Sequence, residues 1–386
     1  MYKGLLRLTL SLALLLGGMS WAQDDDDTLI AGFIYVGPVG DYGWSFAHDM
    51  GRQRAEENLP WLETIFVESV AEAEVETFID QMVRQGAQVI FTTSFGYMDG
   101  TLAAAERYPE VIFAHATGFM RAPNVATYTA EFYQVYYLNG LIAGALTETN
   151  RIGYVAAFPI PEVKRHINAF AMGAAEVNPD AVVEVRWIFD WFNPAAATEA
   201  TQALIAEGAD VFSFTEDTPT VIQVAAEAGF PSFSHYSPML EFAPEHVASG
   251  QLVYWEVIYE DFLSRVRSGE FTAENLEDVD YWSLLYDGSV ALGADEGVLI
   301  APAFEETLQG FMLEHDEFGE ISVYDLVMAR LEQMSQAEPE FDPFTGPVFD
   351  RNGNEVIAEG VTASIEELSS LQWAADNVVG PWPNEP

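Results

Sequence analysis

The chain has 386 residues, of which 61 are acidic and only 15 are lysine or arginine, so its formal net charge at pH 7 is −46. This acidic excess argues against nucleic acid as a partner, because binding phosphates requires basic patches. The chain contains no cysteine, which excludes disulfides, thiolate metal sites and a lipid anchor on cysteine.

The first segment is predicted to be a secretory signal peptide. Two basic residues precede an apolar run over 8–19, and small residues before and at Ala22 provide a cleavage site. The apolar run is too short to span a membrane. We therefore expect a signal peptide over 1–22 and an acidic leader over 23–28. The mature protein is expected to be exported across the inner membrane as a soluble periplasmic or other extracytoplasmic protein.

From Leu29 onward, short apolar runs alternate with amphipathic segments of helical spacing. Units of roughly 25 residues with this alternation are typical of a parallel α/β sheet. We expect strands at 31–36, 64–67, 88–93, 111–114 and 125–128, with helices starting at Ser45 and covering 72–85 and 99–107.

A second series with the same rhythm follows. We expect helices at 132–148, 164–177, 195–207 and 219–228, alternating with strands at 151–157, 182–188, 210–214 and 231–233. The segments 85–91 and 207–212 both contain a Gly-Ala turn and a polar residue before a buried strand. This echo predicts two similar lobes rather than a tandem repeat.

The remaining chain contains less regular elements. We expect a strand at 252–255, helices at 258–267, 305–314 and 323–336, a hairpin over 281–292, and a turn at Asn352-Gly353. No linker separates the lobes, so the chain is expected to cross between them more than once. We assign 29–131 with about 245–280 to lobe 1, and 132–244 with about 281–386 to lobe 2. A hinged cleft between two Rossmann-like lobes would then hold the ligand.

The loop 37–44 lies where a predicted strand ends and a helix begins. It contains Asp41 between glycines and Trp44 just before the helix. In open parallel sheets this is where ligands bind. The alternative role of Asp41 is to cap the helix that starts near Ser45.

Other aromatic and acidic residues share this position at the ends of predicted strands. Aromatic rings stack on flat ligands, and carboxylates accept hydrogen bonds from ring N–H or amino groups. Each aromatic taken alone is as readily explained as part of the core. The predicted ligand-binding residues are Asp41, Trp44, Ser94, Phe95, Phe158, Trp191, Asp217 and Trp255.

Patterns for catalysis or metal binding are weak. Ser94 lies in a turn similar to a nucleophile elbow, but Thr92 replaces the first glycine and no pattern places a histidine with it. The segment 350–355 lacks the spacing of a calcium loop. The six histidines are scattered without metal-ligand spacing. We expect no catalytic residues, no metal and no cofactor.

Several long segments together resemble one family. They are Tyr35–Trp44, His48–Arg52, Thr92–Met98, His115–Gly118, Asn124–Tyr128, Ile152–Val163 and Pro343–Pro347. In this order they are similar to the basic membrane protein (BMP) family of substrate-binding proteins for ABC importers, which includes the purine nucleoside receptor A-like proteins. The resemblance implies a type I periplasmic-binding fold and a purine base or nucleoside as ligand. It assigns Asp41 to recognition of the base and Trp44 to stacking.

The sequence departs from this family at several polar positions. Nucleoside-binding members carry Asn where Ser45 stands. Glu131 and Gln134 replace an Arg and a Glu, while Thr215 and Tyr254 occupy positions that are His and Asn in relatives. Because buried polar groups discriminate strongly between ligands, these positions predict that specificity differs on the side of the pocket facing Asp41.

The sequence therefore predicts a monomeric, non-enzymatic receptor that binds a purine-like molecule and docks on an ABC permease. One alternative is a receptor for another small solute, such as an amino acid or a sugar-like signal. A remote alternative is an extracytoplasmic hydrolase that uses Ser94.

Overall fold

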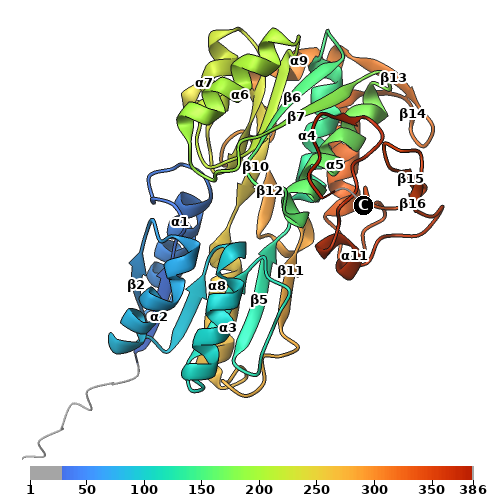
Figure 1. Cartoon of the computed structure of the whole chain (residues 1–386). Helices are drawn as coiled ribbons and strands as arrows, with labels where there is room; N and C mark the ends of the chain where they lie inside the picture. The colour runs from blue at the N-terminus through green and yellow to red at the C-terminus, as the bar shows by residue number, and fades with distance from the viewer. Residues whose placement is uncertain (1–27, 385–386) are drawn as a thin grey trace, which may run out of the picture.

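The structure is a computed structural model that describes residues 28–384. The predicted signal peptide, and all but the last residue of the predicted acidic leader, lie outside the described residues. Two α/β lobes follow one another along the long axis of the molecule (Figure 1), which confirms the predicted two-lobe α/β architecture. No helix within residues 28–384 has the length and apolar character needed to cross a membrane.

Lobe 1 is built on a six-stranded parallel sheet with the order β11-β5-β4-β3-β1-β2. Helices α1 and α8 pack together against one face, and α2 and α3 cover the other. The α2 helix buries Val75, Ile79 and Met82, whose spacing of three to four residues forms one apolar stripe. The strands are β1 Leu29–Ile34, β2 Leu62–Val67, β3 Val89–Thr92, β4 Ile112–Ala116, β5 Val125–Ala130 and β11 Asp280–Ser283. The helices are α1 Trp44–Asn58, η1 Glu72–Glu74, α2 Val75–Arg84, η2 Phe95–Tyr97, α3 Met98–Arg107 and α8 Trp255–Ser268.

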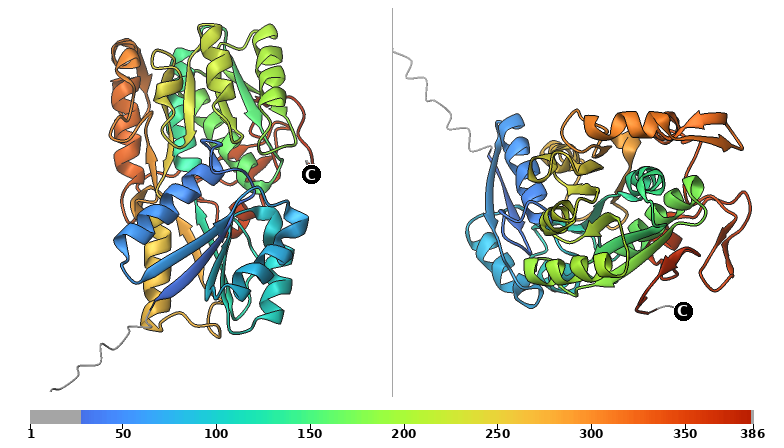
Figure 2. Two further views of the ribbon diagram at one scale, coloured as in Figure 1. Left: turned by 90° about the vertical axis from the view of Figure 1, so that its left-hand side faces the viewer. Right: turned by 90° about the horizontal axis from the view of Figure 1, so that it is seen from above.

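Lobe 2 contains a seven-stranded sheet with the order β12-β10-β9-β8-β6-β7-β17, in which only β12 is antiparallel. Helices α4 and α5 cover one face, and α6 and α7 cover the other (Figure 2). The strands are β6 Arg151–Ala156, β7 Val182–Trp187, β8 Val211–Thr215, β9 Ser232–Tyr236, β10 Val247–Val253, β12 Val290–Leu292 and β17 Val378–Val379. The helices are α4 Tyr133–Leu146, α5 Pro161–Val177, α6 Pro194–Ala206, α7 Thr220–Glu227, η3 Leu240–Phe242 and η4 Leu285–Asp287.

The α4 and α5 helices pack backbone to backbone. A Cβ on Gly140 would lie 2.1 Å from the carbonyl oxygen of Phe170, and a Cβ on Gly173 would lie 2.1 Å from that of Tyr137. Any larger residue at either glycine would therefore push the helices apart. Because α5 begins at the cleft, this contact fixes the position of its first turn.

The chain after β12 wraps along lobe 2 and returns its last strand, β17, to the sheet edge beside β7 (Figures 1 and 2). The elements on the way are α9 Pro302–Gly310, β13 Met312–His315, β14 Gly319–Ser322, α10 Val323–Met334, β15 Val348–Phe349, β16 Glu355–Ile357 and α11 Ile365–Ser369. The predicted helix over 305–314 ends at Gly310, and β13 follows it. The predicted turn at Asn352-Gly353 is confirmed, since it joins the antiparallel strands β15 and β16.

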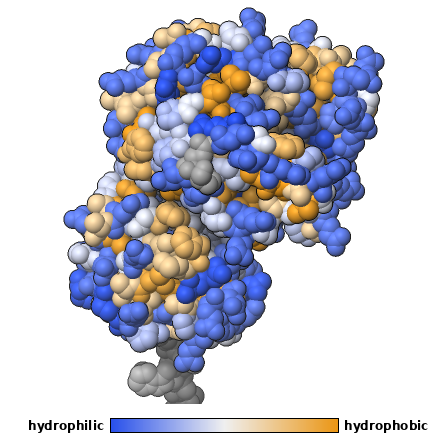
Figure 3. Space-filling model, turned by 45° about the vertical axis from the view of Figure 1, so that its right-hand side comes forward, coloured by the Kyte–Doolittle hydropathy of each residue, from blue (hydrophilic) through white to orange (hydrophobic). Residues whose placement is uncertain are grey.

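The chain crosses three times between the two lobes, which are also distinct in the space-filling view (Figure 3). Two of the boundaries differ from the prediction. The second crossing was expected near residue 245, but β10 pairs with β9 in lobe 2, so the chain leaves that lobe only at Tyr254. The third lies at Leu284, because β11 still belongs to lobe 1. The hairpin expected over 281–292 is therefore wrong: β11 pairs with β5, and β12 pairs with β10 in the other sheet.

Candidate ligand-binding site between the lobes

A small, narrow cavity lies between the lobes, where strands of both sheets end. Five of the predicted site residues line it. From lobe 1 come Trp44, Ser94 and Phe95, and from lobe 2 come Trp191 and Asp217. A concave site with aromatic walls and a few polar groups is typical of small-molecule pockets.

Asp41 lies behind this cavity and is not part of its lining. Its carboxylate accepts hydrogen bonds from the backbone N–H groups of Gly43 (2.8 Å), Ser45 (3.2 Å) and Phe46 (3.0 Å). Burial raises the pKa of Asp41 to about 6, although these N–H groups lower it. These contacts match the capping alternative, because they hold the start of α1. Asp41 therefore fixes the loop that positions Trp44.

Trp44 is held on several sides. Its indole N–H donates to the backbone carbonyl of Thr93, and its ring meets those of Trp255 and Tyr236 edge-on, with centroids 5.2 and 5.1 Å away. Trp255 is fully buried and stacks on His48 at 4.1 Å, away from the cavity lining. Of Trp44 and Trp255, only Trp44 lines the cavity, and Trp255 supports it from behind.

Asp217 joins the two lobes. Its Oδ1 accepts a hydrogen bond of 3.1 Å from the backbone N–H of Trp44. Gly43 permits this approach, because a Cβ there would lie 2.6 Å from the Cα of Asp217. Burial, together with the nearby charge of Asp41, raises the pKa of Asp217 well above its ordinary value. Burial also raises the pKa of the adjacent Glu216.

Ser94 reaches the cavity, but its hydroxyl donates to the Glu72 carboxylate at 2.9 Å. The nearby histidine, His115, has its Nε2 2.8 Å from the backbone oxygen of Ser94 and not from the hydroxyl. A serine nucleophile needs a base hydrogen-bonded to its hydroxyl. The geometry around Ser94 instead suits a polar wall of a binding pocket.

Phe158 does not line the cavity. Its ring packs against Trp191, with centroids 5.1 Å apart. Phe158 therefore supports the cavity wall in lobe 2, much as Trp255 does in lobe 1.

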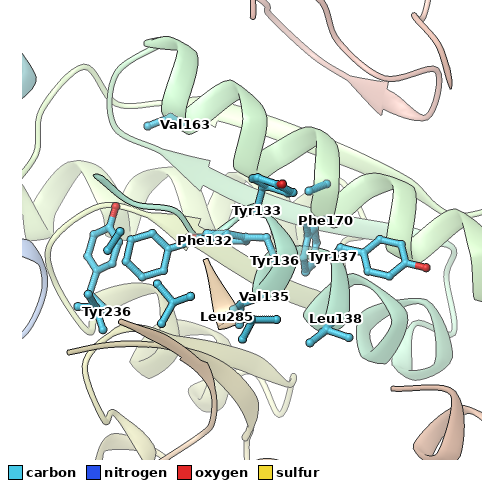
Figure 4. Packing of buried hydrophobic residues seen from close by; sticks show 14 of the residues in the cluster. Phe132, Tyr133, Val135, Tyr136, Tyr137, Leu138, Val163, Phe170, Tyr236 and Leu285 are labelled. Atoms are coloured by element: carbon cyan, nitrogen blue, oxygen red, sulfur yellow. The ribbon is translucent and has the colours of Figure 1, made fainter. Parts of the chain in front are cut away.

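Five further residues complete the lining, and sequence reasoning did not select them: Val36, Thr117, Ile160, Glu162 and Tyr236. Two of them were missed because helix and strand boundaries were misjudged. The α5 helix begins at Pro161 instead of 164, which places Glu162 in its first turn. The β9 strand continues to Tyr236 instead of ending at 233, and Figure 4 shows the Tyr236 ring beside that of Phe132.

Of the two acids that line the cavity, Glu162 has less internal support than Asp217. Its side chain is buried, at 7% exposure, and its carboxyl makes no hydrogen bond with residues 28–384. Burial and the charge of Glu131 raise the pKa of Glu162 to about 8, against the opposing effect of Arg165. Lysine, arginine and histidine are all missing from the described residues that line the cavity. Asp217 accepts the Trp44 N–H, so any further hydrogen bond to Asp217, and any to Glu162, would come from a ligand or from water.

The positions where the sequence departs from the family lie outside this lining. Burial alone would raise the pKa of Glu131, but Arg165 and His166 lower it to about 2 by ion pairing and hydrogen bonding. Gln134 is buried and accepts a hydrogen bond from the Leu285 backbone. Thr215 and Tyr254 do not line the cavity either. Within residues 28–384, no group of three or more histidine or carboxylate side chains is arranged to hold a metal ion.

Two α/β lobes joined by three crossings around a shared cavity define a type I solute-binding protein, the fold class that the sequence predicted. Solved structures have this fold. An ABC transporter solute-binding protein from Conexibacter woesei superposes with a TM-score of 0.61 at 19% identity, covering 82% of this chain and 99% of the other. One from Aeropyrum pernix superposes with a TM-score of 0.62 at 21% identity, covering 81% and 88%.

Sequence comparison gives the family. The model of the Bmp family, described as ABC transporter substrate-binding protein PnrA-like, matches residues 29–292. A purine-binding protein of Brucella abortus is 35% identical over 93% of this chain and 94% of its own length. A putative ABC transporter glucose-binding protein of Haloferax volcanii is 36% identical over 89% and 81%. The chain therefore belongs to the Bmp family of PnrA-like ABC transporter substrate-binding proteins, which are extracytoplasmic and bind a small molecule and a membrane permease.

Proposed function

We propose that this protein is the extracytoplasmic receptor of an ABC importer for a purine base or nucleoside, and that it acts as a monomer. The observation that carries the proposal is the composition of the interlobe cavity. Aromatic side chains from both lobes meet there with two buried carboxyls, Asp217 and Glu162, and without a basic lining residue. A flat ligand with several N–H groups satisfies both features. The name of the Brucella relative supports this ligand class.

In this proposal each wall of the cavity has its own role. Trp44 and Phe95 present aromatic surface from lobe 1, and Trp191 presents it from lobe 2. Asp217 accepts hydrogen bonds from the edge of the base. Because Asp217 of lobe 2 also accepts a hydrogen bond from the Trp44 backbone of lobe 1, it contacts the ligand only where the two lobes meet. Asp41 acts indirectly, by holding the loop and helix that carry Trp44.

The direct test is to identify what the protein binds. Native mass spectrometry of freshly purified protein should detect a purine or its nucleoside, released on denaturation. Calorimetry on protein that has been unfolded, dialysed and refolded should then give binding of the same compound. Absence of any purine binding in a panel of bases, nucleosides, sugars and amino acids contradicts the proposal.

A sugar is the second candidate, because the Haloferax relative is named as a putative glucose-binding protein and is as similar as the Brucella one. Aromatic rings and carboxylates also bind sugars, by stacking on C–H faces and accepting from hydroxyls. The two candidates separate in the same panel: stabilisation by glucose or another free sugar, without any by a purine, favours the second.

A further inference from the structure

The lobes also touch outside the ligand cavity, through Tyr42. This residue lies in the loop before α1 of lobe 1, and its ring meets the ring of Phe242 in lobe 2 edge-on, with centroids 4.9 Å apart. The hydroxyl of Ser237 in lobe 2 donates to the backbone carbonyl of Tyr42. None of these three residues lines the cavity. Their contacts therefore join the lobes directly, beside the ligand space.

The backbone of Tyr42 has an unusual conformation. Its φ is 63°, in the left-handed region that a bulky residue adopts only at a cost in free energy. A glycine at this position would avoid that cost, and glycines already stand nearby at Gly40 and Gly43. Backbone strain of this kind persists where the surroundings hold it in place. The contact with Phe242, which a glycine could not make, gives the tyrosine side chain a role at this position.

Each half of the ring contact is anchored in its own lobe. Within lobe 1, the Tyr42 ring stacks on Phe46 of α1 at 5.3 Å, and the Asp41 carboxylate accepts hydrogen bonds from the backbone on both sides of this loop's junction with the helix. Within lobe 2, Phe242 packs against the buried cluster beneath α6 and α7. Because both rings are already held, their meeting orders few side chains. Edge-to-face ring pairs also stabilise by more than the area they bury.

We propose that Tyr42, Ser237 and Phe242 form a latch that holds the two lobes together beside the ligand cavity. They are positioning residues, since they act on a ligand only through the arrangement of the lobes. The buried acids at the interface oppose closure, and the latch offsets part of that cost, so that a fraction of the ligand-free molecules is closed. A ligand enters and leaves while the latch is open, so the strength of the latch sets the rate of both steps. The latch does not depend on which small molecule the cleft takes.

The test measures the distance between the lobes without any ligand. The chain has no cysteine, so two introduced cysteines take spin labels at defined places. Glu106 in α3 of lobe 1 and Glu199 in α6 of lobe 2 are both exposed and suit this purpose. Pulsed electron spin resonance on protein that has been unfolded, dialysed and refolded gives the distribution of distances between the labels. Closed molecules are those at the label distance expected from this structure, and the labelled protein with an intact latch should contain them.

Tyr42→Ala and Phe242→Ala should each lower the ratio of closed to open molecules at least about fivefold. The double variant should lower it no further than one of the single changes, because either change already removes the ring contact. Tyr42→Phe should match the unmodified latch, since it keeps the ring and the Tyr42 hydroxyl makes no hydrogen bond with residues 28–384. Phe349→Ala is the matched control, because Phe349 is an exposed phenylalanine on β15, and it should leave the ratio unchanged.

Unchanged ratios in Tyr42→Ala and Phe242→Ala, with normal thermal unfolding, overturn the latch. A double variant with the full product of the two single effects overturns it too, since the residues would then act independently. So does an unmodified latch without any closed molecules. If Phe242→Ala fails to fold, the comparison of Tyr42→Ala with Tyr42→Phe decides, because neither change touches lobe 2. Failure of purine binding would leave this result standing, as the measurement uses no ligand.

Discussion

Glu162→Gln should change how stability depends on pH. Glu162 has an ordinary pKa of 4.5 that burial and the charge of Glu131, opposed by Arg165, raise to about 8 in the folded protein. The folded chain therefore binds this proton more tightly than the unfolded chain does. Because of this linkage, proton binding at Glu162 contributes its full stabilisation of the folded state below about pH 4.5. This stabilisation is lost as pH rises toward about 8.

The size of the effect follows from the two pKa values. Each tenfold difference in proton affinity corresponds to about 1.4 kcal/mol. Between 4.5 and about 8, the wild-type protein should thus lose up to about 5 kcal/mol of unfolding free energy through Glu162. This is an upper bound, because opening of the lobes rehydrates the carboxyl. Glutamine has no proton to lose, so this part of the pH dependence should be missing from the variant.

Urea unfolding of ligand-free protein, followed by tryptophan fluorescence at pH 5, 6.5 and 8, measures the difference. The variant should gain stability relative to wild type as pH rises, by several kcal/mol between pH 5 and 8. Glu366→Gln is the matched control, since Glu366 is exposed on α11 and its substitution removes the same charge. Parallel curves for wild type and Glu162→Gln would refute the assignment of Glu162 as a buried, unpartnered carboxyl.

Three further changes test the loop and its contacts. Trp44→Ala should weaken purine binding about tenfold in calorimetry, because loss of one stacking ring costs about 1–3 kcal/mol; unchanged affinity would remove Trp44 from the site. Asp41→Ala should lower unfolding free energy by about 1–2 kcal/mol through loss of its bonds to the start of α1, and it should weaken binding too; a loss of affinity without any loss of stability would instead indicate direct contact with the ligand. Gly43→Ala should hinder the meeting of the lobes, since its Cβ would collide with Asp217. The result would be weaker binding and no ligand-induced compaction in small-angle scattering, and compaction like that of wild type would contradict this role.

The lobes could be predicted from the sequence because their strands and helices follow local rules. Short apolar runs that alternate with helical segments predicted both sheets. The two Gly-Ala turns also have the same backbone conformation. Gly86 and Gly208 have φ values of 94° and 96°, a left-handed conformation that glycine adopts easily. Each ends a helix just before a buried strand, as the repeated sequence pattern indicated.

The boundary errors arose where tertiary packing overrides the local pattern. β10 contains Ser249 and Gln251, which look like loop residues, yet both are fully buried because neighbours cover the strand on all sides. The residues 281–292 show turn chemistry at Gly288, but their two strands join different sheets across the hinge. Pairing between distant segments leaves no signal within a short window of sequence.

The site was predictable to the extent that it follows strand ends. That rule found Trp44, Phe95, Trp191 and Asp217, which do line the cavity. It could not separate a ring that faces the cavity from one that lies behind it, so Trp255 was selected as well. The orientation of a side chain in the first turn of a helix depends on the residue where the helix starts. Sequence patterns define that residue only to within one or two positions.

The lobe interface buries acidic groups at a free-energy cost that a ligand can offset. On one side of the interface, Arg54 of α1 pairs with Glu296 of lobe 2 at 2.6 Å, but both side chains are partly exposed, and such a pair contributes at most about 1 kcal/mol. On the other side, the contact between Trp44 and Asp217 brings two acids together, and the pKa of Asp41 and that of Asp217 are both raised, first by burial. Burying these carboxyls costs free energy, and the surface pair offsets only a small part of it. A ligand that donates hydrogen bonds to the cavity carboxyls offsets this cost, so the acids that line the cleft would make its closure depend on the ligand.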